Sequence, residues 1–462
     1  MRKTLLATLV LALPMTQPAL AQMQVPASQA EISMGFTPVV EQSAPAVVNI
    51  YAKRIVSERV SPFMNDPFFG SIFRGQGQVR QRVSNSLGSG VILSEDGIVV
   101  SNYHVVGDAT EIRVVLRDRR EFNAQVLLAD EESDLAILQL DDAEGLPHLD
   151  LRDSDDVAVG ELVLAIGNPF GVGQTVSSGI VSGLARSGVG GEGGRGYFLQ
   201  TDAPINPGNS GGALVDINGH LIGVNTSILT RSGGSNGIGF AIPANLVARF
   251  VEQARAGETS FQRPWAGVTG QAVDFDMAGG LGLSIPEGVI LSSIHSESPF
   301  AAVGFEPGDI VVAVDEQPVN TPQEMIFRMS VAGIGQEAAV TRLRDGTRET
   351  FEVAMITPPD RPARDEATLS RRVVLAGMTV ANVNPAVISE MGLPLDATGV
   401  VIMDAGPIAP RLGLQTADIL LGINGTQITQ STEVEEALRD AGRSGVIEVL
   451  RAGRRMAFRF RV

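Results

Sequence analysis

The sequence predicts a mainly β protein in which one large antiparallel β domain precedes two copies of a smaller domain. The first observation is a series of short strand-like runs, divided by Gly, Asn and Asp, from about Val39 to Ile242. Strands at this spacing are typical of a sandwich or barrel of roughly 200 residues. The second is a C-terminal part that repeats itself at a nearly constant offset. The third is the length, since 462 residues correspond to about three domains at ~150 residues each.

Eight runs of apolar and β-branched residues in the first half of the chain are expected to be strands. They are residues 47–51, 90–93, 97–100, 112–116, 135–138, 161–166, 179–181 and 221–224. Two stretches between them are expected to be long surface loops. Residues 57–83 place phenylalanines among Pro, Gly and Arg, and residues 187–196 consist mainly of Gly. Loops this long within a compact domain are usually functional or disordered.

The internal repeat predicts two small domains after the large one. Trp265-Ala266-Gly267-Val268 recurs 110 residues later as Leu375-Ala376-Gly377-Met378, and residues 304–311 recur 109 residues later as 413–420. Each unit spans about 90–100 residues, the size of one small domain. The Pro-rich, charged stretch between them is expected to be an extended, semi-rigid linker. The expected divisions are a signal peptide (1–21), a large domain (22–256), a first repeat (257–358), a linker (359–372) and a second repeat (373–462).

The N-terminus has the pattern of an export signal. Arg2 and Lys3 form a positive region, residues 5–13 are apolar, and Ala19-Leu20-Ala21 is a small-x-small cleavage site. Cleavage is expected after Ala21. The apolar run is far short of the ~20 residues that span a bilayer, so no stable membrane span is expected. A retained signal anchor is the alternative.

Composition excludes several functional classes. Lys and Arg number 35 against 52 Asp and Glu, a net charge of −17, which argues against a nucleic-acid partner. With no cysteine, the chain has no disulfide, zinc–thiolate site, iron–sulfur cluster or thiol nucleophile. Neither lysine stands in the glycine pattern of a P-loop. The four histidines are too thinly spread for a metal site, so we expect no metal and no cofactor. Three of these histidines, His148, His220 and His295, are interpreted as surface residues.

Gly208-Asn209-Ser210-Gly211-Gly212 is the sharpest motif in the chain. A serine hydroxyl becomes a nucleophile when a base takes its proton and donors hold the resulting oxyanion. Flanking glycines permit unusual φ values and a close approach of a substrate backbone. We therefore expect Ser210 to be a nucleophile and the turn of Gly208, Asn209 and Ser210 to form an oxyanion hole through its backbone N–H groups. The alternative is an ordinary turn.

The base and its orienting acid are expected from position in the chain. His104 follows an apolar strand, and Asp134 heads the apolar run 135–138. Each signal is weak alone, because a lone His or Asp at a strand end is usually structural. The order His, Asp, Ser within an all-β region is that of the chymotrypsin-type triad. We predict that His104 is the general base, Asp134 its orienting acid and Ser210 the nucleophile.

Four segments carry a resemblance to a known family. Residues 101–106 (SNYHVV), 133–138 (SDLAIL), 166–171 (IGNPFG) and 201–212 (TDAPINPGNSGG) resemble the Deg/HtrA family of periplasmic serine endopeptidases. The resemblance is looser in the second repeat, where Thr416-Ala417-Asp418 replaces the usual Pro-Gly-Asp. The absence of cysteine also departs from relatives with a loop disulfide. The implied fold is mainly β: a chymotrypsin-like double β-barrel protease domain followed by two PDZ-like α+β domains.

The resemblance also implies a function. It implies an ATP-independent endopeptidase of the periplasm that degrades misfolded or damaged envelope proteins, with chaperone activity in addition. It implies homotrimers, which in some relatives assemble into larger cages. The rival interpretation, from another class, is a proteolytically weak PDZ-based chaperone or scaffold of the cell envelope in which the barrel is a relic.

Three further sets of residues are assigned by the resemblance. A primary specificity pocket with an apolar lining would favour a small aliphatic side chain, because Lys or Arg would bury an unpaired charge there; the alternative is that its residues are ordinary core. Arg186 would be a regulatory residue, against the alternative of a solvated surface arginine. The first repeat would bind C-terminal peptides through a nest of backbone N–H groups, against the alternative of a spacer. The pocket residues are Ile205, Ile228, Leu229 and Ile238, and the nest residues are Trp265, Ala266, Gly267 and Val268.

Overall fold

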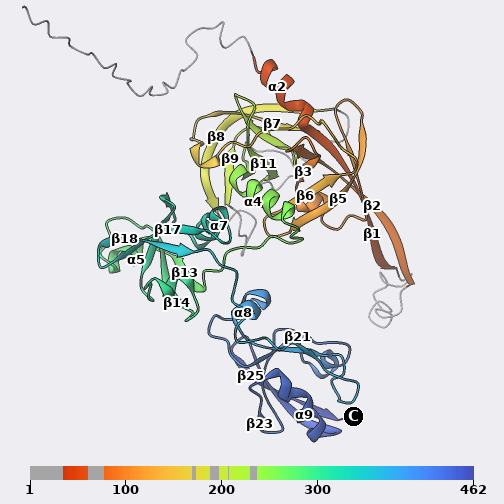
Figure 1. Ribbon diagram of the computed structural model, residues 1–462, viewed down its shortest axis with the longest axis vertical. Coiled ribbons are helices and arrows are strands. Elements are labelled where there is room, and N and C mark those ends of the chain that lie inside the picture. The colour runs from red at the N-terminus through yellow and green to blue at the C-terminus, as the bar shows by residue number, and fades with distance from the viewer. Residues whose placement is uncertain are drawn as a thin grey trace, which may run out of the picture.

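The protein consists of two β-barrels followed by two smaller sheets (Figure 1). The computed structural model describes residues 35–60, 78–168, 173–187, 197–206, 208–228 and 237–461. Both barrels are closed, with strand orders β1-β2-β3-β6-β5-β4 and β10-β11-β12-β9-β8-β7. The predicted signal peptide and residues 188–196 of the predicted glycine-rich loop lie outside the described residues. The predicted fold, a double barrel followed by two PDZ-like domains, is confirmed.

The barrel strands coincide with the apolar runs of the sequence. The first barrel contains β1 (Val47–Val60), β2 (Gln78–Ile92), β3 (Ile98–Ser101), β4 (Glu111–Val115), β5 (Glu121–Asp130) and β6 (Leu135–Leu140). The second contains β7 (Leu162–Gly167), β8 (Thr175–Ser187), β9 (Tyr197–Thr201), β10 (Ala213–Asp216), β11 (Leu221–Ile228) and β12 (Gly239–Pro243). Short helices α2 (Thr37–Ser43) and α3 (Tyr103–Val106) accompany the first barrel, and α4 (Ala244–Arg255) follows the second.

Aliphatic side chains fill the first barrel and leave no room for more. Val99, Ile137 and Leu138 are fully buried inside it. At Gly90 an added Cβ would lie 2.8 Å from the Cδ1 atom of Ile50, so the position requires glycine. Helix α4 packs Phe250 into the same core, where it stacks on Phe261 at 4.0 Å between ring centroids. The helix therefore fixes the point at which the chain leaves the barrels.

The prediction of a surface loop over residues 57–83 was wrong at both ends. β1 and β2 pair along their whole length, from Val47 opposite Val91 to Val60 opposite Gln78. The hairpin extends well beyond the barrel (Figure 1). Strand pairing continues because backbone hydrogen bonds need no apolar side chain, and only residues 61–77 lie outside the described part of the chain.

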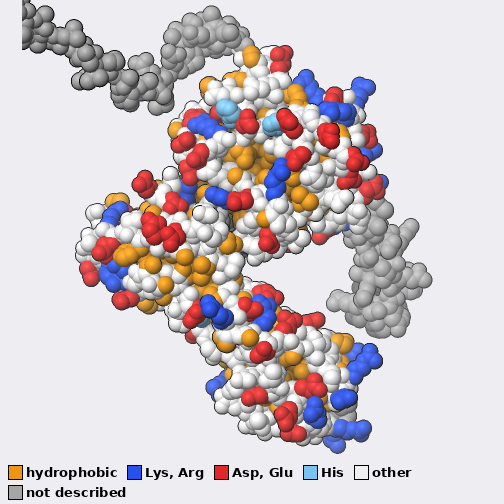
Figure 2. Space-filling view, viewed as in Figure 1, with side chains coloured by type: hydrophobic (Ala, Val, Ile, Leu, Met, Phe, Trp, Pro, Cys, Tyr) orange, Lys and Arg blue, Asp and Glu red, His pale blue; other side chains and the backbone are white. Residues whose placement is uncertain are grey.

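The first repeat forms one sheet and contacts the second barrel through a helix. Its strands are β13 (Val268–Ala272), β14 (Val289–Ile294), β15 (Ile310–Val314), β16 (Gln317–Pro318), β17 (Glu337–Arg344) and β18 (Thr347–Ala354), with α5 (Phe275–Gly280), α6 (Pro299–Ala302) and α7 (Pro322–Ala332). Phe327 of α7 stacks on Tyr197 of β9 at 3.8 Å between ring centroids, and Arg328 donates to the Tyr197 hydroxyl at 2.8 Å. Hydrophobic side chains gather on the face of this repeat shown in Figure 2.

The second repeat forms a similar sheet and contains an ion pair equivalent to one in the first repeat. Its strands are β19 (Ala367–Thr368), β20 (Thr379–Asn382), β21 (Val400–Asp404), β22 (Ile419–Ile423), β23 (Thr426–Gln427), β24 (Ser444–Arg451) and β25 (Arg454–Arg461), with α8 (Pro385–Met391) and α9 (Ser431–Ala441). Arg451 donates to Asp418 at 2.6 and 2.7 Å, as Arg344 does to Asp309 in the first repeat. Ala417 adopts a φ of 69°, a left-handed conformation that costs a residue with a side chain about 1–2 kcal/mol.

The prediction of a linker over residues 359–372 needs correction. Much of this stretch is bonded to the second repeat rather than free between the repeats. Asn382 donates its backbone N–H to the carbonyl of Arg364 at 2.7 Å, and Asn384 Nδ2 donates to the carbonyl of Pro362 at 2.7 Å. Leu369 is buried in the core of the repeat. Composition indicated an extended chain correctly but gave no sign of the surface on which it lies.

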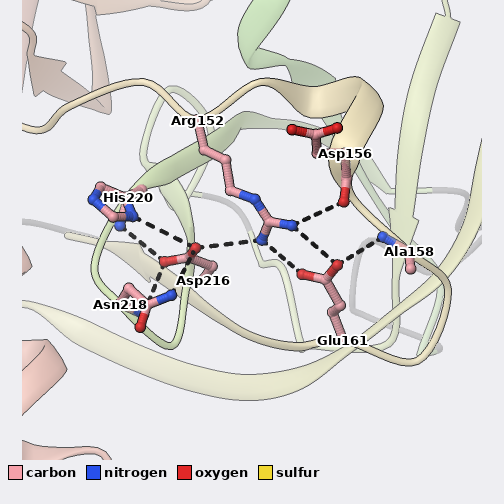
Figure 3. Close-up of polar contacts among 7 residues, drawn as sticks. All are labelled: Arg152, Asp156, Ala158, Glu161, Asp216, Asn218 and His220. Carbon is pink, nitrogen blue, oxygen red and sulfur yellow. Dashed lines mark hydrogen bonds and ion pairs between the residues drawn. The ribbon is translucent and has the colours of Figure 1, made fainter. Parts of the chain in front are cut away.

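A polar cluster joins the segment before β7 to the β10–β11 hairpin (Figure 3). Arg152 donates to the two carboxylate oxygens of Glu161 at 2.7 and 3.1 Å and lies 3.3 Å from Asp216 Oδ2. The Asp216 side chain is 3% exposed and accepts the backbone N–H groups of Asn218 and His220 at 2.9 and 3.0 Å. The His220 ring stays partly exposed beside it. The cluster therefore ties the segment before β7 to the end of β10, through Arg152 between Glu161 and Asp216.

Acid should weaken this cluster, and the pKa of Glu161 gives the direction. Hydrogen bonds from Arg152 hold that pKa below its ordinary value. A carboxylate whose pKa is lowered by folding adds stability above its unfolded-state value of about 4.3 and loses it as pH falls through the folded-state value. We expect Glu161→Gln to lower the thermal midpoint at neutral pH, and to lower it less near pH ~3, because the carboxylate of the wild type loses part of its stabilising effect once the pH is below about 4.3.

Calorimetry at the two pH values measures this difference. Exposed Glu144 provides the matched control, and Glu144→Gln should leave the midpoint nearly unchanged at both. An equal loss for Glu161→Gln at both pH values would contradict the assignment.

Candidate active site

His104 and Asp134 meet because neighbouring strands of the first barrel carry them. β3 pairs with β6, with Ser101 opposite Ala136, so the turn after β3 lies beside the turn before β6. The Nδ1 atom of His104 lies 2.9 Å from both carboxylate oxygens of Asp134, and its backbone N–H donates to Oδ1 at 3.1 Å. Asn102 donates to the Asp134 carbonyl at 2.9 Å. This geometry fixes the imidazole with Nδ1 toward the acid and leaves Nε2 for a proton transfer.

The Ser210 turn belongs to the second barrel and is bonded to the first. Ser89 of β2 donates its hydroxyl to the Gly208 carbonyl at 2.7 Å and its N–H to the Ser210 carbonyl at 2.9 Å. Gly211 has a φ of 82°, and a Cβ there would lie 2.1 Å from the Ser89 carbonyl oxygen. Glycine is therefore required next to the serine, because the two barrels touch at this point.

Two of the three residues proposed for the oxyanion hole keep a free donor. Within the described chain, the N–H groups of Gly208 and Ser210 have no acceptor. Gly208 has a φ of 101°, which only glycine adopts easily. The expectation for Asn209 needs correction: its N–H donates to the Asn206 carbonyl at 2.9 Å, within the turn. Its donor therefore shapes the turn instead of facing the site.

Thr226 of β11 joins the acid to the nucleophile, and sequence reasoning missed it. Its hydroxyl donates to Asp134 Oδ2 at 2.6 Å, and its backbone carbonyl accepts the Ser210 hydroxyl at 3.0 Å. The described residues show no hydrogen bond between Ser210 and His104, and the Ser210 hydroxyl is bonded to the Thr226 carbonyl instead. A threonine within a β-strand is too common to signal such a role, because the contact depends on how the barrels pair.

A cavity of about 430 Å³ lies beside His104 on the first barrel. Tyr103, Asp108 and Glu131 are among its lining residues, and Asp108 forms an ion pair with Arg54. The negative charge of Asp108, followed by burial and by Glu131, raises the pKa of Tyr103. The cavity is therefore a mainly negative environment next to the imidazole.

Of the four residues predicted to line the specificity pocket, the structure describes the side chains of two, Ile205 and Ile238. Ile205 is fully buried in the core of the second barrel, which agrees with the alternative of ordinary core. It lies directly beneath Gly239, where an added Cβ would come within 2.7 Å of its Cδ1 atom. Ile238, one residue before β12, is 38% exposed. The side chain of Ile228 and all of Leu229 lie outside the described residues.

Arg186 lies near the contact between the barrel and the first repeat. Its backbone is opposite Phe198 in the β8–β9 pairing, one position from Tyr197, which stacks on Phe327. The Arg186 side chain is outside the described part of the chain.

The predicted nest in the first repeat is a compact loop before β13. Trp265 packs over Gly267, where a Cβ would lie 2.7 Å from the Trp265 ring, and Gly267 has a φ of 62°. Ser298 donates its hydroxyl to the Ala266 carbonyl at 2.6 Å. His295, expected on the open surface, is half-buried against the edge of Trp265 at 5.5 Å between ring centroids. The loop therefore has a fixed shape, and Val268 begins the strand at the edge of the sheet.

Comparisons with known proteins agree with this geometry. A trypsin-like peptidase domain model matches residues 88–224, and a PDZ domain model matches residues 258–355. A probable periplasmic serine endoprotease, DegP-like, from Pseudomonas fulva is 37% identical over 459 residues, which cover 92% of this chain and 93% of that protein. The chain belongs to the Deg/HtrA family of periplasmic serine endoproteases. The family, enzyme class and location predicted from the sequence are thereby confirmed.

Two further Deg/HtrA proteins show how far the likeness extends. The periplasmic pH-dependent serine endoprotease DegQ of Escherichia coli is 35% identical over 405 residues, 87% of this chain and 86% of that protein. The solved structure of the HtrA-type protease AlgW with decapeptide is 38% identical with a TM-score of 0.52, covering 70% of this chain and 99% of that chain. Among the described helices of this Deg/HtrA protein, none is long and apolar enough to cross a membrane.

Removing the Thr226 hydroxyl should impair catalysis without unfolding the site. A hydrogen bond to a charged group contributes about 1.5–3 kcal/mol, and each 1.36 kcal/mol is about tenfold in rate. We expect Thr226→Val to lower kcat about tenfold or more with KM little changed, because Asp134 loses a donor that orients it.

Thr226→Ser keeps the hydroxyl and should restore most of the activity. Steady-state kinetics on one peptide substrate, with melting curves of both variants, measure the effect. Equal kcat values for the Val and Ser variants would show that the hydroxyl does not orient Asp134.

Proposed function

We propose that this protein is an ATP-independent endopeptidase that degrades misfolded or damaged periplasmic proteins and cuts after small aliphatic residues. The observation that carries the proposal is the pairing of His104 with Asp134 and their connection to Ser210 through Thr226. We further propose chaperone activity, and a homotrimer that assembles into larger cages, on the family relationship alone. The proposed units are residues 22–256 for the protease, 257–358 and 373–462 for the two PDZ domains, and a 359–372 connection that packs on the second of them.

In the proposed mechanism, Ser210 first leaves the Thr226 carbonyl and donates to Nε2 of His104. The imidazole takes the hydroxyl proton as Oγ attacks the substrate carbonyl, and the Gly208 and Ser210 N–H groups stabilise the oxyanion. His104 then gives the proton to the leaving amine, and an acyl-enzyme remains. Water, deprotonated by His104, hydrolyses the acyl-enzyme and restores Ser210.

The proposed preference for a small aliphatic residue follows from apolar surroundings. Ile238, which is exposed just before β12, supplies no charged partner. A Lys or Arg side chain placed there would lose its hydration without a counter-ion, which is costly. Val and Ala side chains lose nothing comparable on entering.

A cleavage assay separates the endopeptidase from the rival scaffold. Wild type should hydrolyse unfolded casein without ATP and cut peptides with Val or Ala at the scissile position in preference to Lys or Phe. Ser210→Ala should keep the melting temperature and lose activity on the order of a million-fold, as for other triad serines.

Two results would reject the proposal. An inactive wild type would favour the scaffold, and an active Ser210→Ala protein, free of other proteases, would reject the nucleophile. Equal cleavage after Val and Lys would reject only the apolar pocket.

We propose that the first repeat captures C-terminal peptides of substrates at the loop of Trp265, Ala266, Gly267 and Val268. The proposal is supported by the compact loop, in which Trp265 packs over Gly267, and by the outer edge of β13, which no described strand covers. A related HtrA-type protease was solved with a decapeptide. Peptides bound at such an edge add a strand to the sheet. The repeat packs on the barrel through α7, so a captured substrate stays near the cleft at high effective concentration.

We propose that Arg186 regulates turnover. Its backbone lies beside the strand that contacts α7, so a change at the first repeat is transmitted to the start of the glycine-rich loop. Arg186→Ala should lower kcat/KM more than it lowers the melting temperature, because a guanidinium braces carbonyls or carboxylates of neighbouring loops. Arg120→Ala, at an exposed turn of the first barrel, is the control. Kinetic constants equal to wild type would reject this role.

A further inference from the structure

The two repeats differ at the outer edge of their sheets. In the first repeat β13 is the terminal strand, and no described strand covers its outer edge. In the second repeat β20 holds the corresponding place, but β19 covers it, with Ala367 opposite Val380 and Thr368 opposite Thr379. The covering strand comes from the chain's own connection between the repeats.

The backbone bonds of this segment are those of a peptide bound at a sheet edge. Leu369 donates its N–H to the Met378 carbonyl at 2.8 Å, and Gly377 donates its N–H to the Leu369 carbonyl at 3.0 Å. Gly377 belongs to the loop Leu375-Ala376-Gly377-Met378, the second copy of the predicted nest. The Leu369 carbonyl therefore lies where a nest of this kind receives the terminal carboxylate of a peptide.

The side chain of Leu369 fills an apolar site behind that loop. It is 4% exposed and belongs to the core that contains Leu375, Met378 and Val434. On its C-terminal side, Ser370 donates its hydroxyl and its N–H to the Glu435 carboxylate of α9 at 2.8 and 3.3 Å. The segment is thus held by the strand, by the loop and by the helix of the repeat.

The equivalent segment of the first repeat is held elsewhere. The Thr259 carbonyl accepts the Ala129 N–H of the first barrel at 3.4 Å, and Phe261 stacks on Phe250 of α4. Arg263 forms an ion pair with Asp130 at 2.5 Å. Because the barrel retains this segment, it does not lie on β13.

We infer that Ala367, Thr368 and Leu369 are a resident ligand of the second repeat and close its groove to the C-termini of substrates. When the segment is displaced, the groove accepts peptides that end in Ala-Thr-Leu or a similar apolar residue. The inference concerns the groove of the second repeat alone. It stands whether or not the first repeat captures substrates.

A photo-crosslinking experiment on the full chain tests this. The parent is Ser210→Ala, so that peptides are not cut, and the probe is Asp-Glu-Ala-Thr-Leu with a photoreactive group at its N-terminus. In Leu369→Ser the apolar anchor is lost, and labelling near residues 375–382 and 431–438 should rise at least about tenfold, since a buried leucine side chain contributes one to two factors of ten to binding. The same peptide ending in Asn should not label these residues.

Leu395→Ser is the matched control, because Leu395 is a partly buried leucine of the same repeat in a different cluster. It should leave the groove closed. Labelling at residues 265–268 reports separately on the first repeat. Strong labelling of the second groove in the parent would overturn the inference, as would a folded Leu369→Ser protein that stays unlabelled.

Amide exchange of the parent provides a test that needs no substitution in residues 367–369. The N–H groups of Leu369 and Gly377 should exchange as slowly as those of β20, because both are bonded across the groove. Fast exchange at these two positions, with β20 protected, would show that the segment does not remain in the groove. This result holds even if Leu369→Ser unfolds the repeat.

Discussion

The geometry of the candidate active site depends on hydrogen bonds that cross the seam between two barrels. Neither barrel contains a complete site, since His104 and Asp134 belong to the first and Ser210 to the second. Ser89 bonds the serine turn to the first barrel, and Thr226 bonds the acid to the second. These hydrogen bonds set the position of Ser210 relative to His104, the proposed nucleophile and base, and the strand pairings around them hold the bonded residues in place. The whole double barrel therefore acts as the support for a few contacts at its seam.

The two repeats show how one fold is adapted by what lies on its edge. Both contain an equivalent ion pair between a buried aspartate and a partly exposed arginine, Asp309 with Arg344 and Asp418 with Arg451. This shared ion pair explains why the second repeat keeps its Asp even where Ala417 replaces the usual glycine and accepts strain. The difference lies outside the core, at the outer edges of β13 and β20. The two repeats thus have similar sheets, and the flanking chain decides which outer edge is covered.

The sequence predicted the features that depend on local pattern and missed those that depend on distant contacts. The order of His, Asp and Ser was informative because the strands that carry His104 and Asp134 are neighbours in the sheet. Thr226 was missed because its bond to Asp134 exists only once the barrels are paired. The burial of Leu369 was missed because Pro and charge around it indicate an extended chain and say nothing of what that chain contacts. Asn209 was assigned to the wrong role, since a motif does not show which N–H a turn uses for itself.

Tethering explains why a groove can be filled by a short segment with few contacts. A free peptide gives up translational and rotational freedom on binding, at a cost of several kcal/mol. Residues 367–369 lose little translational and rotational freedom on binding, because residues 362–364 already hold the chain against the second repeat. Their effective concentration at the groove therefore exceeds that of any peptide in solution. In the first repeat the corresponding segment is held by the barrel through Arg263 and its neighbours. The first barrel, which carries His104 and Asp134, thus also keeps the outer edge of β13 uncovered.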